Sequence, residues 1–375
     1  MNQSNSKWTI FPILFGFFVM GFVDVVGIST NYVKHDFGLS DTLANLIPMM
    51  VFLWFAIFSI PTGMLMGRIG RRNTVAVSLG ITIVAMLLPL FLYDFASVLL
   101  AFALLGIGNT ILQVSLNPMV ASVVSSGKVT SVLTLGQFLK AVSSFLGPLI
   151  AGAAASFWGD WKWIFAVYAV TTLLSLTWLL AGVHEEEKKS AQASTFATVC
   201  SLFKDRYIVM LFLGILFIVG IDVGLNTTIP KLLMEKTGMS VSEAGLGSSL
   251  YFSARTIGSF VGAFLLARIA SDRFMQYSMG IAIVGFILLL VVDSLLWISI
   301  LVVIVGLTCS NVFSIIFSYA LQHLPERDNE ISALMIMGVS GGALITPLGQ
   351  VAGLSLLLLC LLYLGWISFR LQKRK

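Results

Sequence analysis

The chain has 375 residues, of which 58% are hydrophobic and only 10% are charged, and its mean hydropathy is +0.99. Soluble globular proteins carry about 25% charged residues, so this composition excludes a water-soluble globular protein. The formal net charge of +5 is explained by basic residues in the loops, where they set the membrane topology and lie near lipid headgroups. The net charge therefore does not indicate nucleic-acid binding.

Apolar runs recur along the whole chain, and each can cross a bilayer core of roughly 30 Å as a helix. Peptide groups left unpaired in lipid are costly, so these runs are expected to be helices rather than open sheets or loops. We therefore predict an all-α membrane protein with twelve transmembrane helices, at about 9–33, 43–67, 74–92, 96–124, 130–155, 163–183, 207–233, 242–267, 274–292, 294–321, 331–349 and 351–369.

Four ionisable residues lie well inside these spans. They are Asp24 in span 1, Lys140 in span 5, Asp222 in span 7 and Arg255 in span 8. A charge at a helix centre costs at least about 2.5–3.5 kcal/mol on insertion scales, which argues against chance placement. We expect an ion pair in each half, Asp24 with Lys140 and Asp222 with Arg255, acting in proton coupling or gating. The second pair has an equally good structural reading, as a tie between helices.

Uncharged polar residues follow the same spans. Span 4 carries three amides at positions i, i+4 and i+8, which puts them on one helix face. Amides both donate and accept hydrogen bonds, as sugar hydroxyls do, so such a stripe suits a polyhydroxylated ligand. The residues expected to contact substrate are Asn31, Asn109, Gln113, Asn117, Gln137, Lys140, Asn226, Tyr251 and Asn311.

The second half of the chain repeats the first at an offset of 200 residues. Residues 38–40 (Gly-Leu-Ser) recur at 238–240 (Gly-Met-Ser), and Gly106 recurs as Gly306. The one long polar stretch, 184–206, separates the two copies. We predict a six-helix half at 1–183, a cytoplasmic linker at 184–206 and a second six-helix half at 207–375, the architecture of a rocker-type transporter.

Basic residues are distributed unevenly between the loops. If both termini are cytoplasmic, 16 of the 22 Lys and Arg residues fall on the inner side and 4 on the outer side. This asymmetry follows the positive-inside rule and predicts a multi-pass protein with cytoplasmic termini. Short loops favour a bacterial inner membrane, and we expect a monomer.

Two segments resemble a known family. Residues 63–72 (Gly-Met-Leu-Met-Gly-Arg-Ile-Gly-Arg-Arg) are similar to the signature loop of the major facilitator superfamily, with Gly67 where an Asp is usual. Residues 106–118 (Gly-Ile-Gly-Asn-Thr-Ile-Leu-Gln-Val-Ser-Leu-Asn-Pro) resemble an element of its fucose:proton symporter and glucose/galactose porter family.

This resemblance implies a sugar permease of the major facilitator fold. It implies that Gln113 and Gln137 contact sugar, and Lys140 falls where the family commonly has a sugar-contacting Asn. The protonatable Asp of the fucose permease aligns with Gly27, so Asp24 lies one turn earlier.

We therefore expect a secondary transporter that imports a monosaccharide or related polyol by alternating access. Asp24 is the expected proton-linked acid, with sodium as the alternative coupling ion. The alternative function is an antiporter or exporter of a drug or anionic metabolite, including sugar acids. An enzyme is disfavoured because no nucleophile–base set, phosphate loop or His/Cys cluster is present, and we expect neither a cofactor nor a metal site.

Overall fold

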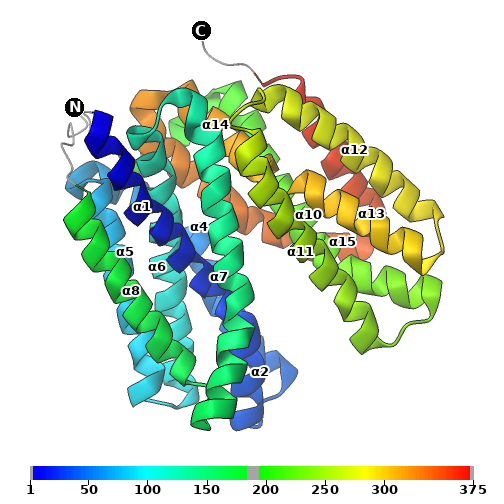
Figure 1. Cartoon of the computed structure of the whole chain (residues 1–375), viewed down its shortest axis with the longest axis horizontal. Helices are drawn as coiled ribbons and strands as arrows, with labels where there is room; N and C mark the ends of the chain where they lie inside the picture. The colour runs from blue at the N-terminus through cyan, green and yellow to red at the C-terminus, as the bar shows by residue number, and fades with distance from the viewer. Residues whose placement is uncertain (1–2, 184–193, 372–375) are drawn as a thin grey trace. The chain divides into compact units, whose positions relative to one another are not determined.

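The computed structural model describes residues 3–183 and 194–371, and these residues form helices and short connections without any strand (Figure 1). The first part of the chain contains α1 (Gln3–Met20), the 3₁₀ turn η1 (Gly21–Val25), α2 (Val26–Asp36), α3 (Asp41–Ala44), α4 (Leu46–Ile69), α5 (Arg71–Phe91), α6 (Phe95–Val123), η2 (Ser126–Lys128), α7 (Val129–Trp158) and α8 (Trp163–Gly182).

The second part contains α9 (Phe196–Ser201), η3 (Leu202–Lys204), α10 (Arg206–Thr237), α11 (Val241–Leu265), α12 (Ser271–Val291), α13 (Leu295–Cys309), α14 (Val312–His323), η4 (Pro325–Arg327) and α15 (Asp328–Ser368). The short elements α9 and η3 occupy the end of the predicted linker 184–206, and residues 184–193 of that linker lie outside the described residues.

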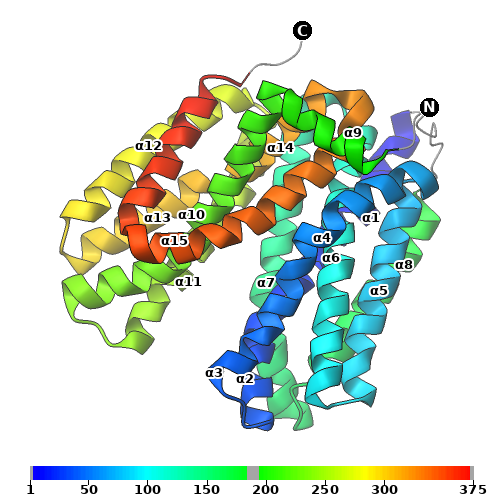
Figure 2. The same ribbon diagram turned by 180° about the vertical axis from the view of Figure 1, so that it is seen from behind.

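All twelve predicted spans lie in helices, which confirms the all-α membrane fold. Nine stretches of the described residues, from Trp8–Asp36 to Leu295–His323, are long and apolar enough to cross a membrane. The remaining predicted spans lie in α11 and α15. The last two spans, predicted as separate helices, form the single element α15, which changes direction sharply along its course (Figure 2).

Backbone contacts divide the chain into two compact units. Unit 1 comprises Met1–Ser125, Leu139–Cys200 and Glu326–Met337, and unit 2 comprises Ser126–Phe138, Ser201–Pro325 and Gly338–Lys375. These units follow the two predicted halves, 1–183 and 207–375, except at the beginnings of α7 and α15. There, 126–138 groups with unit 2 and 326–337 groups with unit 1.

The 200-residue repeat is visible in local geometry. Gly38 and Gly238 both have positive φ, 61° and 69°, which glycine adopts without steric cost. The serines that follow two residues later, Ser40 and Ser240, both begin a helix by accepting a hydrogen bond from a backbone N–H three residues on. The repeated tripeptide thus forms the same turn and helix cap twice.

The repeat also extends to helix packing. A Cβ added to Gly106 of α6 would lie 2.4 Å from the Val51 oxygen of α4, and one added to Gly306 of α13 would lie 2.8 Å from the Tyr251 oxygen of α11. Both partners are related by the same offset of 200 residues. In each unit a glycine therefore allows the corresponding pair of helices to approach closely.

Helix α6 forms the centre of unit 1, where it packs against α1, α4 and α5 (Figure 1). Every residue from Gly108 to Val120 is buried, so the helix is enclosed on all sides. Polar side chains within that stretch must therefore find partners inside the protein, because an unpaired buried polar group is costly.

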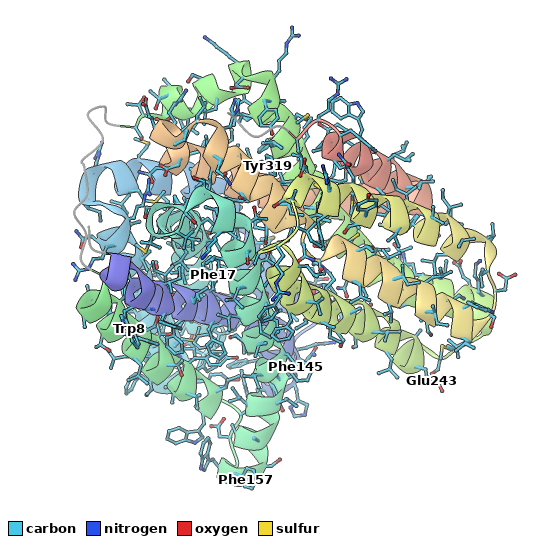
Figure 3. The ribbon with its side chains drawn as sticks, turned by 45° about the horizontal axis from the view of Figure 1, so that its top comes forward. Trp8, Phe17, Phe145, Phe157, Glu243 and Tyr319 are labelled. Carbon is cyan, nitrogen blue, oxygen red and sulfur yellow. The ribbon has the colours of Figure 1, made fainter. Side chains whose placement is uncertain are left out.

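Large apolar side chains cover the outside of the helices. Trp8, Phe145 and Phe157 are exposed (Figure 3), whereas Phe17 of α1 is fully buried. Exposed apolar surface of this extent is expected where helices face lipid rather than water.

Candidate functional site

The first predicted span is not a continuous α-helix, and its irregular turn carries Asp24. Helix α1 ends at Met20, the 3₁₀ turn η1 spans Gly21–Val25, and α2 begins at Val26. A 3₁₀ stretch within a long helix often marks a hinge. Of the five residues in η1, only Asp24 is exposed. The turn therefore presents a carboxylate from an otherwise buried backbone.

The partner of Asp24 is Ser144 of α7, whose hydroxyl donates to the carboxylate at 2.5 Å. The predicted ion pair between Asp24 and Lys140 is not formed in this structure, and that prediction is corrected. The reason is close packing at Gly21, where an added Cβ would lie 2.4 Å from the Lys140 carbonyl oxygen and 2.7 Å from Cβ of Ser143. The Lys140 backbone lies against η1, and Ser144, one helical turn further along, supplies the side-chain contact.

The Ser144 hydroxyl has more than one acceptor within reach. Besides Asp24, the carbonyl oxygens of Lys140 and Gly21 lie at 2.9 Å and 3.4 Å. A hydroxyl has one proton to donate, so the bond to Asp24 competes with a bond inside α7. Gln137, Lys140 and Ser144 are spaced i, i+3 and i+7 in the sequence, which puts them on one helix face, and this spacing is the signal that could have found Ser144.

The three predicted amides of α6 form a hydrogen-bonded chain. Nδ2 of Asn117 donates to the backbone carbonyl oxygen of Gln113 at 2.8 Å, and the side-chain Nε2 of Gln113 donates to Oδ1 of Asn109 at 2.8 Å. Nδ2 of Asn109 then donates to the carbonyl oxygen of Met20 at 2.7 Å. All three amide side chains are buried. The stripe therefore ends at the junction between α1 and η1.

The other predicted contacts of the first half are more open. Gln137 and Lys140 are half-buried on α7, and Asn31 is exposed on α2. Backbone contacts group Gln137 with unit 2 and Lys140, Asn31 and the α6 amides with unit 1. The structure thus links Gln113 through Asn109 to the Met20 carbonyl, four residues before Asp24.

The predicted ion pair in the second half is present, and this prediction is confirmed. Nη1 of Arg255 on α11 lies 2.6 Å from Oδ2 of Asp222 on α10. The hydroxyl of Tyr251, a fully buried residue one turn before Arg255, donates to Oδ1 of Asp222 at 2.9 Å. Both oxygens of the Asp222 carboxylate are therefore occupied within unit 2.

Two predicted substrate contacts of unit 2 have different environments. Asn311 is buried, and its Nδ2 donates to the Gly258 carbonyl at 3.2 Å and to Oγ of Ser310 at 2.8 Å. It lies against Gly262, where an added Cβ would be 2.2 Å from Asn311 Oδ1. Asn311 therefore fills a contact between α11 and the α13–α14 junction, whereas Asn226 of α10 is exposed.

A polar cluster that the sequence did not predict lies at the start of α5. Arg71 forms an ion pair with Asp328, and its Nε donates to Oδ1 of Asn329 at 2.7 Å. Nη1 of Arg71 donates to the Pro118 carbonyl at 3.1 Å. Burial raises the pKa of Asp328 even though Arg71 opposes that change. An acid at the start of α15 thus pairs with the signature loop, in which Gly67 replaces the usual acid.

The described residues contain no group of three or more His, Cys, Asp or Glu side chains that could hold a metal ion. A bundle of apolar helices with an acid in a hinged turn, a buried amide chain and an intramembrane ion pair is the arrangement expected of a membrane transporter. These features define the class of the protein as a multi-pass transporter.

The chain belongs to the Major Facilitator Superfamily, whose family model matches residues 13–347. It is 26% identical over 368 residues to a glucose/galactose transporter of Brucella abortus, covering 93% of this chain and 88% of that protein. It is also 26% identical over 266 residues to the fosmidomycin resistance protein of Escherichia coli, covering 67% of this chain and 64% of that protein.

The fold is similar to that of a solved transporter over almost the whole chain. The crystal structure of the E. coli fucose:proton symporter matches with a TM-score of 0.84 at 16% sequence identity, covering 97% of this chain and 98% of that chain. At this low identity the match establishes the fold, the major facilitator fold expected from the sequence.

Proposed function

We propose that this protein imports a monosaccharide or related polyol by alternating access, coupled to the entry of a proton. The observation that carries the proposal is Gln113, the expected sugar contact, whose amide is hydrogen-bonded to Asn109 and through it to the Met20 carbonyl beside the turn bearing Asp24. The likeness to a glucose/galactose transporter along nearly the whole chain supports a sugar as the substrate. The charge asymmetry of the loops supports cytoplasmic termini, and we place the protein, as a monomer, in a bacterial inner membrane.

Proton coupling rests on the environment of Asp24. An ionised carboxylate in a membrane span is costly to enclose, and binding a proton removes that cost. Because Asp24 is exposed and bonded to one hydroxyl, Ser144, it is accessible to a proton while the site is open. Protonation would then favour a closed or inward-facing state, which is how a proton gradient drives accumulation.

The alternative is export or exchange of an anionic metabolite, and the observation that favours it is Lys140. This side chain is half-buried, and no described carboxylate lies within ion-pairing distance of its ammonium group. A substrate carboxylate would compensate that charge. The likeness to the fosmidomycin resistance protein is in keeping with this second function.

Uptake into proteoliposomes separates the two functions. We would compare D-galactose with D-galacturonate, which differ by one carboxylate, alongside D-glucose and L-fucose, with and without an inward proton gradient. The proposal predicts gradient-driven accumulation of a neutral sugar. If the protein transports only galacturonate, and Lys140→Met abolishes that transport, the sugar proposal is replaced by transport of an anionic metabolite.

A further inference from the structure

Asn109 was expected to contact substrate, but its position in the fold suits another role. The side chain is only 2% exposed. Its Nδ2 is bonded to the Met20 carbonyl of α1, and its Oδ1 is bonded to Nε2 of Gln113. Both the nitrogen and the oxygen of the Asn109 amide are therefore hydrogen-bonded inside the protein. Asn109 thus lies between Gln113, the expected sugar contact, and the turn η1.

The hydrogen bond from Asn109 to Met20 joins α6 to the point where the backbone changes from an α-helix to a 3₁₀ turn. Met20 is the last residue of α1, and the 3₁₀ turn begins at the next residue, Gly21. The pattern of backbone hydrogen bonds changes at this junction, and a side-chain donor to the Met20 carbonyl stabilises it. Asp24 lies within the same turn, four residues from Met20. A shift of Asn109 would therefore be transmitted to the backbone that positions Asp24.

The other side of η1 is held by α7. Gly21 packs against the backbone of α7 at a distance that no larger residue fits, and Ser144 bonds to Asp24. The turn is thus held between the amide chain on α6 and one hydroxyl on α7. Coupling between two sites requires an element that both sites bias, and η1 is contacted from both sides.

We propose that Asn109 is a positioning residue that couples sugar binding at Gln113 to the proton-binding turn at Asp24. Sugar hydroxyls that bond to the Gln113 amide would weaken or reorient its bond to Asn109, and Asn109 would in turn change its hold on the Met20 carbonyl. Asn109 touches neither the sugar nor the proton. This inference rests on the proposed sugar and proton functions, and deepens them by naming the link between the two sites.

The variant that tests the link is Asn109→Leu, which keeps the number and branching of the side-chain heavy atoms and removes both hydrogen bonds. The matched control is Thr110→Val, at the adjacent buried position, because the Thr110 hydroxyl bonds only to the Gly106 carbonyl of its own helix. Labelled D-glucose and D-galactose would be used in proteoliposomes. Sugar exchange without a gradient and accumulation under a proton gradient would be measured for each variant.

We expect Asn109→Leu to keep sugar exchange, while its gradient-driven accumulation ratio falls about fivefold or more, the lower range of coupling between two sites. Thr110→Val should resemble the unmodified protein in both assays. Parallel loss of exchange and accumulation in Asn109→Leu would indicate a structural role and overturn the proposal. A weaker apparent affinity with unchanged accumulation at saturating sugar would indicate a direct contact and also overturn it.

A second measurement tests the link without any sugar. Amide hydrogen exchange of residues 20–26 should be faster in Asn109→Leu than in Thr110→Val, because the Met20 junction loses its side-chain donor. Equal exchange in the two variants would overturn the proposal. If the unmodified protein transports no sugar, the proposed function fails, and the hydrogen-exchange result still decides whether Asn109 holds the turn.

Discussion

The carboxylate of Asp222 uses one oxygen to bind Arg255 and the other to accept from Tyr251. The side chains of Arg255 and Asp222 are only 21% and 15% exposed, so each charge depends on the other for compensation. The contrast with Asp24 is instructive, because that acid is exposed and has a hydroxyl as its partner. We infer that Asp222 is held in place by these two partners, whereas Asp24 is contacted by a single hydroxyl and is open to solvent.

A double-mutant cycle tests whether the Asp222–Arg255 pair is held in this way. Arg255→Met leaves a buried charge without compensation and is expected to destabilise the protein by about 3–5 kcal/mol. Adding Asp222→Asn should recover most of that loss, since neither charge then remains. Thermal unfolding in detergent, followed by tryptophan fluorescence, gives the comparison. If the double variant is as unstable as the sum of the two single variants, the two side chains are not coupled.

At the scale of the element, the turn Gly21–Val25 is the feature on which the site depends. It joins α1 to α2 and touches α7 through Gly21 and Asp24, and the residue before it, Met20, accepts a bond from Asn109 of α6. A glycine is required at position 21 because the α7 backbone leaves no room for a side chain. The same span offers a comparison at Gly27, where an added Cβ would meet no atom within 4 Å.

This difference predicts opposite results for two identical substitutions. Gly21→Ala should cost about 1–3 kcal/mol of stability, the usual penalty for overpacking. Gly27→Ala should leave stability unchanged or slightly higher, since alanine restricts the unfolded chain and meets no neighbour. Unfolding temperatures of the two purified variants provide the test. Equal unfolding temperatures would show that η1 and α7 do not approach closely at Gly21.

The sequence predicted the elements better than it predicted their contacts. Apolar run length located the spans, because that signal is local. The repeated tripeptides 38–40 and 238–240 were recognised as a repeat, and the structure shows that both form the same turn, with positive φ at Gly38 and Gly238. The 3₁₀ turn at Asp24 was missed since it depends on contacts from α6 and α7. Charge signs alone paired Asp222 with Arg255 successfully but failed for Asp24, because the backbone of Lys140 packs against Gly21 and Ser144 contacts the carboxylate instead.

At the scale of the whole molecule, the loop charges make a prediction about topology. With cytoplasmic termini, the turn between α10 and α11 at Gly238 lies on the outer side. Alkaline phosphatase fused after Gly238 should then be active, because the enzyme needs export to fold, whereas a fusion at the C-terminus should be inactive. The reverse pattern would invert the proposed orientation and contradict the positive-inside assignment.

Asp24 is the residue that we propose links transport to a proton. Asp24→Asn removes the titratable group and keeps a side chain of the same size that Ser144 can still contact. Asp41→Asn is the matched control, because Asp41 is 86% exposed and lies outside the predicted spans.

The most direct measurement is the uptake of labelled sugar by proteoliposomes containing Asp24→Asn, in parallel with the unmodified protein and Asp41→Asn. We predict that Asp24→Asn exchanges sugar across the membrane but no longer accumulates it against a gradient, while Asp41→Asn does both. Uphill accumulation retained by Asp24→Asn would contradict the assignment of Asp24 as the proton-linked acid.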